Sequence, residues 1–169
     1  MKLDLFGRLA GSRETDRQRR LVEILVGEMR FGVDIMSVSE VVGPGPVIPL
    51  PGAPAHVIGV ADHRGRVVPV LDLRRRLQLE GGRGSRAMWV ITGSDAAETA
   101  ILVDRVAGVI AVDPGDRREQ SPLMFGAGTG WIRGVWSHGR GLVFELDLAA
   151  VTGGAREALE RSSTAPQRP

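Results

Sequence analysis

The sequence predicts a mostly β protein built from two small, similar barrels, and two observations carry this prediction. The first is an internal repeat: residues 59–73 align without a gap with residues 134–148, and seven of the fifteen positions are identical. The second is a series of short apolar runs, separated by Gly- and Pro-rich turns, across residues 21–152. Many short strands with regular turn signals are typical of barrels and sandwiches. The repeat favours two barrels of similar construction.

The expected elements follow the chain in order, each from a short apolar run and its flanking turn residues. Pro69 argues for an edge strand or a bulge, because proline cannot donate to a β-ladder. Asp72 and Asp147 hold duplicate positions, where they are expected to end strands and cap the next turn. The predicted strands are residues 21–26, 31–35, 67–71, 87–92, 100–103 and 142–146, and the predicted short helical turns are residues 53–59 and 72–77.

The predicted organisation has three parts. Residues 1–20 form an N-terminal tail, and residues 21–152 form the folded domain, with subdomains of about 21–80 and 81–152 and strand exchange between them. Residues 153–169 form a C-terminal tail with a short helix-like stretch at residues 155–160. Both tails are expected to be mobile, because they offer too little apolar surface to offset the entropy lost on ordering.

Composition indicates a cytoplasmic protein with no direct insertion into a membrane. No apolar run approaches the roughly 20 residues that span a bilayer, and no signal-peptide core is visible in the 169 residues. Absence of cysteine excludes disulfides and thiolate metal sites. The net charge is only +2, so the calculated pI of about 10.2 adds little support for nucleic-acid binding.

Candidate catalytic residues are sparse, and no enzyme and no cofactor is expected. His63 and His138 occupy equivalent positions of the repeat, which a duplicated structural position explains better than two catalytic sites. His56 stands outside any metal-ligand spacing. Residues 126–130, Gly-Ala-Gly-Thr-Gly, lack the Gly-Lys-Ser/Thr ending of a phosphate loop, so a flexible loop is expected there.

Residues 59–65, Gly-Val-Ala-Asp-His-Arg-Gly, and residues 68–73, Val-Pro-Val-Leu-Asp-Leu, resemble the CheW family of chemotaxis coupling proteins. That family typically shows Gly-Val-x-Asn-Leu-Arg-Gly followed by Val-Pro-Ile/Val-x-Asp-Leu. The resemblance begins at Val33-Asp34-Ile35, continues through residues 102–106, and covers roughly residues 20–152.

The resemblance implies two intertwined five-stranded SH3-like β-barrels and a non-catalytic adaptor. Such proteins bridge the cytoplasmic tips of methyl-accepting receptors and the regulatory domain of a CheA-type histidine kinase, which is itself CheW-like. Other CheW-like proteins are further implied partners, and recruitment to receptor arrays is the implied location. Apolar grooves and exposed sheet edges suit these contacts, since they accept a helical hairpin or a strand.

By this resemblance, Arg64 and Glu40 are candidate receptor-binding residues, with Val38 expected on the same side of the strand as Glu40. The neighbouring Asp62 and His63 complete the candidate receptor surface. The alternatives are that Arg64 is a solvated turn residue or fixes the barrel junction through a carboxylate, and that Val38 is a core residue. Asp62 could also pair with Arg64.

The implied kinase contact falls on residues 43–48, with Gly43, Pro44, Val47 and Ile48 as candidates. The run Gly-Pro-Gly-Pro removes two backbone donors and offers no side chain for an interface hot spot. A specialised CheW-like protein that binds receptors with weak or no kinase contact is therefore an alternative. A small-barrel nucleic-acid-binding protein is the alternative of another class, although residues 74–76, Arg-Arg-Arg, are more simply a solvated helical turn.

Overall fold

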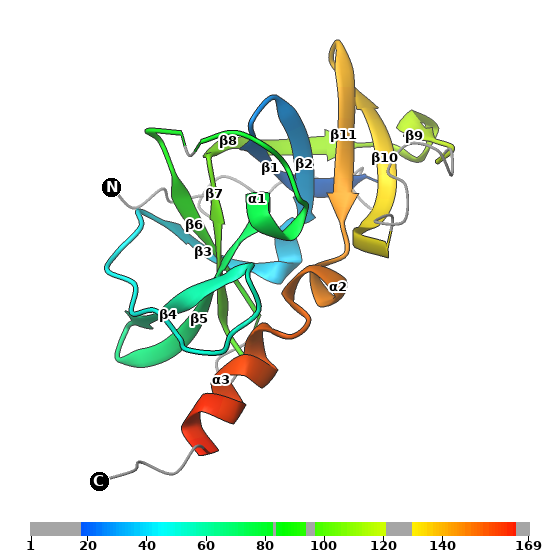
Figure 1. The fold of residues 1–169 in the computed structure, drawn as a ribbon. Coiled ribbons are helices and arrows are strands. Elements are labelled where there is room, and N and C mark those ends of the chain that lie inside the picture. Colours follow the sequence, from blue (N-terminus) through cyan, green and yellow to red (C-terminus); the bar gives the residue numbers. More distant parts are fainter. Residues whose placement is uncertain (1–17, 83, 94–96, 121–129, 165–169) are drawn as a thin grey trace, which may run out of the picture.

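The computed structural model describes residues 18–82, 84–93, 97–120 and 130–164. Its strands form two sheets, which we call sheet A (order β8-β1-β2-β11-β10-β9) and sheet B (order β3-β6-β7-β5-β4) (Figure 1). The strands are β1 (Arg19–Val26), β2 (Met29–Asp34), β3 (Val38–Val42), β4 (Val57–His63), β5 (Arg66–Asp72), β6 (Met88–Thr92), β7 (Thr99–Val103), β8 (Arg105–Val112), β9 (Arg117–Arg118), β10 (Ile132–His138) and β11 (Gly141–Leu146). The helices are η1 (Ile35–Ser37), α1 (Leu73–Arg76), η2 (Pro114–Asp116), α2 (Leu148–Thr152) and α3 (Ala155–Thr164). The predicted mostly β fold with two barrels is confirmed.

The two sheets share one topology, and each gives a strand to the other. In sheet A the hairpin β1–β2 joins the hairpin β10–β11 through a parallel β2–β11 pair, with Phe31 opposite Phe144. In sheet B the hairpin β6–β7 joins β4–β5 through a parallel β7–β5 pair, with Ala100 opposite Val70. Strand β3 follows β2 along the chain but pairs with β6, whereas β8 follows β7 but pairs with β1. The barrels are therefore intertwined, while a subdomain boundary near residue 80 stays a prediction.

The internal repeat corresponds to the hairpins β4–β5 and β10–β11. Each has a register shift at the same place, between Val57 and Gly59 in β4 and between Ile132 and Gly134 in β10. At Gly59 φ is +150°, and a Cβ built there would lie 2.1 Å from the carbonyl oxygen of Ile48. Only glycine allows this close approach of two backbones.

Both copies of the repeat end in the predicted aspartate caps. The Asp72 carboxylate accepts a hydrogen bond from the Arg75 amide at the start of α1. The Asp147 carboxylate accepts one from the Ala150 amide at the start of α2, at 3.1 Å. These side chains satisfy amide groups that a helix start leaves without partners.

The largest core cluster joins the two barrels. It combines Val22 and Phe31 of sheet A with Leu71 and Ile101 of sheet B, each at most 1% exposed, and Val151 of α2. Smaller clusters lie within each sheet. Because apolar burial drives folding, the shared cluster ties the barrels into one unit, with α2 beside their junction (Figure 1). None of the helices in the described ranges is long and apolar enough to cross a membrane.

Three local expectations were wrong, and the first is the helical turn predicted at residues 53–59, where residues 53–56 are turn and irregular backbone and strand β4 begins at Val57. Pro69 is not in an edge strand, since β5 lies between β7 and β4, and the bulge of this hairpin is in β4, between Val57 and Gly59. The missing donor of Pro69 is tolerated because the ladder to β7 begins only at Val70. Arg74 and Arg76 are not solvated, since Arg74 pairs with Asp104 and Arg76 Nη2 donates to the carbonyl of Ala150. The helix-like stretch predicted at residues 155–160 is part of α3, which starts at Ala155 as expected and continues to Thr164.

Most of the expected N-terminal tail and of the loop predicted at residues 126–130 lies outside the described residues.

Candidate functional site

Arg64 lies at the tip of the β4–β5 hairpin. His63 pairs with Arg66, so Arg64 and Gly65 form a two-residue turn, with φ of +54° and +78°. Positive φ at both positions identifies the type I′ turn that matches the twist of a β-hairpin. The Asp62 carboxylate accepts a hydrogen bond of 3.1 Å from the Gly65 amide and fixes the turn.

One carboxylate oxygen organises the candidate receptor surface. Glu40 Oε2 lies 2.8 Å from Arg64 Nη2 and 3.5 Å from His63 Nε2. The Glu40 and His63 side chains are 15% and 10% exposed, whereas the Arg64 side chain is 63% exposed. The structure therefore pairs Arg64 with Glu40, rather than with Asp62, and leaves much of the guanidinium accessible.

This ion pair joins the two ends of sheet B. Glu40 is on β3 and Arg64 follows β4, and these are the two outer strands of the sheet. Because the Arg64 side chain is mostly in solvent, the pair contributes only about 0–1 kcal/mol to stability. Arg64 thus contacts a carboxylate, but within sheet B rather than at the barrel junction that one alternative named, and most of its side chain stays exposed.

Val38 does not share a face with Glu40. A register shift between them makes Val38 and Glu40 pair with the consecutive residues Thr92 and Ile91, which point to opposite faces of β6. Val38 is 6% exposed and belongs to the core cluster that joins the barrels. The expectation of a common face was wrong, and the alternative reading of Val38 as a core residue is correct.

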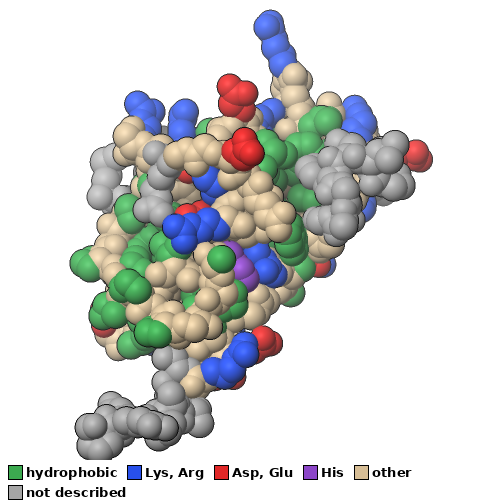
Figure 2. Space-filling model, viewed as in Figure 1, with side chains coloured by type: hydrophobic (Ala, Val, Ile, Leu, Met, Phe, Trp, Pro, Cys, Tyr) green, Lys and Arg blue, Asp and Glu red, His purple; other side chains and the backbone are tan. Residues whose placement is uncertain are grey.

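The candidate kinase loop runs along the outer edge of β4. Ile48 forms an isolated bridge with Val60, through two backbone hydrogen bonds of 2.8 Å. The Ile48 side chain is 68% exposed, whereas Val47 packs against the core of sheet B. Gly43 and Pro44 are exposed. In the view of Figure 2, apolar side chains gather over this barrel, at the lower left.

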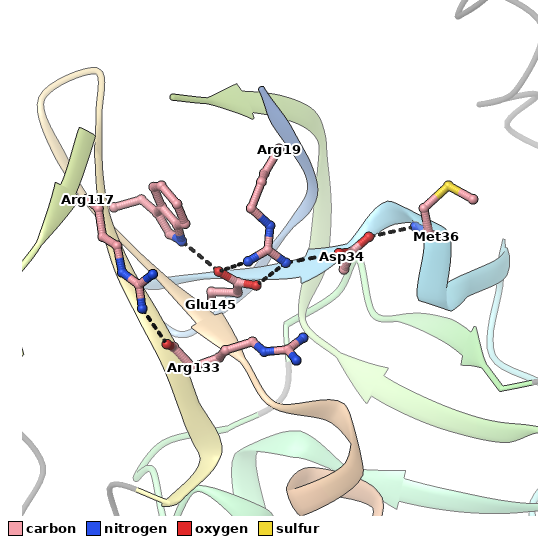
Figure 3. A network of polar contacts seen from close by, with 7 residues as sticks. Arg19, Asp34, Met36, Arg117, Arg133 and Glu145 are labelled. Atoms are coloured by element: carbon pink, nitrogen blue, oxygen red, sulfur yellow. Dashed lines mark hydrogen bonds and ion pairs between the residues drawn. The ribbon is translucent and has the colours of Figure 1, made fainter. Parts of the chain in front are cut away.

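Sheet A holds a buried polar network that the sequence did not reveal (Figure 3). Glu145, 1% exposed, lies 2.7 Å from Arg19 Nη2 and accepts a 2.8 Å hydrogen bond from the Trp136 indole. Arg19 also lies 3.0 Å from Asp34, whose other carboxylate oxygen accepts from the Met36 amide. A glutamate inside an apolar strand was the available signal, because buried charges need partners.

A second polar cluster lies where α1 meets α2. Arg76 Nη2 donates to the Ala150 carbonyl at 2.7 Å, and its guanidinium stacks 5.2 Å from the centre of the Trp131 ring. Its Nη1 lies 3.4 Å from His56 Nε2. Burial, and then the Arg76 charge, lower the pKa of His56 below 6.5. The three histidines lie at three different places. His56 is at this junction and His63 lies beside Glu40. The backbone carbonyl of His138 accepts a hydrogen bond from Arg30.

The described side chains contain no group of three His, Cys, Asp or Glu that could hold a metal ion. In the view of Figure 2, Lys and Arg side chains are scattered and separated by acidic and neutral ones, without a continuous basic stripe.

Comparisons with known proteins find relatives in sequence and a similar fold. The chain is 34% identical to a chemotaxis protein CheW of Treponema pallidum over 138 residues, covering 79% of this chain and 81% of that protein. It is 38% identical to protein FrzA of Myxococcus xanthus over 94 residues, covering 54% and 58% of the two chains. The fold matches the crystal structure of scaffolding protein TtCheW from Thermoanaerobacter tengcongensis with a TM-score of 0.73, at 21% identity, covering 83% of this chain and 92% of that one. A family model described as CheW-like domain matches residues 20–155. The chain belongs to the CheW-like domain family.

Proposed function

We propose that the protein is a non-catalytic chemosensory adaptor that couples methyl-accepting receptors to a CheA-type histidine kinase. The family and the relatives named chemotaxis protein CheW support this role. An adaptor of this kind acts in the cytoplasm and is recruited to receptor arrays. It needs no cofactor, because it works through protein surfaces alone.

The observation that carries the proposal is the Arg64 tip of the β4–β5 hairpin. Its side chain is held by Glu40 at one end of the guanidinium, yet remains 63% exposed. Arg64 also stands in the Arg-Gly position of the family motif. A guanidinium that is already oriented loses little conformational freedom when it meets a second carboxylate. We propose that this carboxylate belongs to the helical hairpin at the receptor tip, with Glu40, Asp62 and His63 around it.

The experiment is calorimetry with a receptor cytoplasmic hairpin and the variant Arg64→Glu. The substitution puts a second carboxylate beside Glu40 and removes the cation, so binding should weaken at least about tenfold, or about 1.4 kcal/mol. The melting temperature should change little, because the exposed ion pair contributes about 0–1 kcal/mol. Arg140→Glu is the matched control, since Arg140 is exposed in the equivalent turn between β10 and β11. Unfolding of Arg64→Glu, or equal binding by both variants, would contradict the assignment.

The kinase contact is proposed to be weak, and the loop before β4 supports this. Alternate residues of an extended segment direct their amides to opposite sides, and Ile48 directs its amide and carbonyl to Val60. On the outer side, Val47 is the remaining donor between Pro46 and Pro49, which have none. A strand of the kinase regulatory domain added there would form few hydrogen bonds, so side-chain contacts from Val47 and Ile48 would have to provide the affinity.

A further inference from the structure

Helix α3 is attached to the barrel by a small apolar contact. Its fully or nearly buried side chains in the described range are Ala155 and Ala158, at 0% and 7% exposed, with Leu159 half-buried. The helix lies against β5 and extends away from the barrels toward the C-terminus (Figure 1). Alanine methyl groups bury little area, so the apolar burial that holds the helix is small.

Two grooves flank α3. One has a volume of about 460 Å³ and runs between Met36, the turn after β6 and Leu148 of α2; the other, of about 320 Å³, lies between Val67 of β5 and Leu159 of α3. Arg156 of α3 and Ala97, before β7, line both grooves, so they form the wall between them. Met36 is 89% exposed and Val67 is 60% exposed, which leaves large apolar side chains open on either side of the wall.

The connection to α3 permits movement. Gly153 ends α2 with an extended backbone, and Gly154 follows at φ +82°. A Cβ at Gly154 would meet nothing within 4 Å. Two consecutive glycines have low barriers to a change of φ and ψ, and hinges use a few such residues at the ends of elements.

The position of α3 connects it to the Arg64 surface. Arg66, two residues after Arg64, lines the smaller groove together with Glu160 of α3, while Ser37, three residues before Glu40, lines the larger one. We propose that α3 is a displaceable helix that covers part of the receptor-binding surface, and that the receptor hairpin takes its place on β5. This inference rests on the proposed function. A helix already fits there, and an occupant with longer apolar side chains than two alanines would fill both grooves and cover Met36 and Val67.

Native-state hydrogen exchange of the unmodified chain tests whether α3 opens alone. Amides of α3 should exchange about 100-fold faster than those of β5 and β7, because local opening needs less free energy than global unfolding. Exchange of α3 only together with the strands would overturn the inference.

Calorimetry with a receptor hairpin tests the competition. Ala158→Asp places a carboxylate in the buried contact and should unseat α3, while Arg161→Gln makes the same change of one charge unit on the exposed face. If α3 is open in about one tenth of the molecules, Ala158→Asp should bind about tenfold more tightly than the unmodified protein, because the open fraction limits the apparent affinity. Arg161→Gln should bind as the unmodified protein does.

Weaker or unchanged binding by a folded Ala158→Asp variant, with normal binding by the unmodified protein, would overturn the inference and leave the proposed function standing. No binding by any of the three proteins would contradict both.

Discussion

Replacing Arg19 with methionine should destabilise the protein strongly, because it leaves Glu145 buried without its cation. Glu145 is 1% exposed and lies 2.7 Å from the Arg19 guanidinium (Figure 3). After the substitution its remaining partner is the Trp136 indole, at 2.8 Å. A single neutral donor offsets only part of the cost of keeping a carboxylate out of water.

The expected magnitude follows from the burial of the two partners. Breaking a fully buried ion pair by removing one side typically costs about 3–5 kcal/mol. The Arg19 side chain is 36% exposed, so water can reach the gap and the cost should fall at the lower end, about 3 kcal/mol. The contact of Arg19 with Asp34, which is 33% exposed, adds about 0–1 kcal/mol at most. The melting temperature should fall by about 6–12 °C.

Urea unfolding of four proteins decides this prediction: unmodified, Arg19→Met, Glu145→Gln and the double variant. The double variant should be more stable than the sum of the single losses implies, by about 1 kcal/mol or more, because the two groups interact directly. Arg20→Met is the control in the same strand, and its effect should stay within about 0.5 kcal/mol. A loss below about 1 kcal/mol for Arg19→Met, or additive losses, would refute the reasoning.

Three further predictions concern the junction, the repeat and the kinase loop. Burial and the Arg76 charge lower the pKa of His56 in the folded protein, so the unfolded chain binds more protons at mildly acidic pH. The free energy of unfolding should therefore be steady above pH 6.5 and fall as the pH drops below 6.5. Urea titrations from pH 5 to 8 measure this, and His56→Gln should reduce the dependence of the unfolding free energy on pH. Gly59→Ala should lower the free energy of unfolding by about 3 kcal/mol, measured by thermal unfolding, because the added Cβ would displace the Ile48 bridge. Gly134→Ala should lower it less, because the Cβ added there meets only side-chain atoms. Calorimetry with an isolated kinase regulatory domain should give a Kd weaker than micromolar, the Kd that corresponds to a binding free energy of about −8 kcal/mol. Tighter binding would show that the loop before β4 is compatible with an ordinary coupling contact.

The sequence was sufficient for the features that repeat or that depend on neighbouring residues. The ungapped match of residues 59–73 with residues 134–148 predicted two barrels of similar construction, and the structure places the two copies in equivalent hairpins with their bulges at the same place. The first strand of each hairpin was not predicted. The Asp72 and Asp147 caps were predictable for the same reason, since a cap depends on residues three positions apart.

Features that depend on contacts between distant residues were not predictable. The extra residue between Val38 and Glu40 changes the face of one of them, and no local pattern announces it. Arg76 looks like a solvated charge in its own segment, yet its hydrogen-bond acceptor lies 74 residues further on. The pairing of Arg64 with Glu40 likewise requires that the outer strands of sheet B approach each other.

Mapping of a receptor hairpin onto the protein by NMR tests the central claim most directly. The hairpin should shift the backbone signals of Asp62, His63, Arg64 and Glu40, together with those of η1 and α3, while the equivalent turn at Gly139 and Arg140 stays unchanged. Shifts centred on the β10–β11 turn, or no shifts at hairpin concentrations up to about 1 mM, where even a weak complex of about −4 kcal/mol would form, would contradict the account.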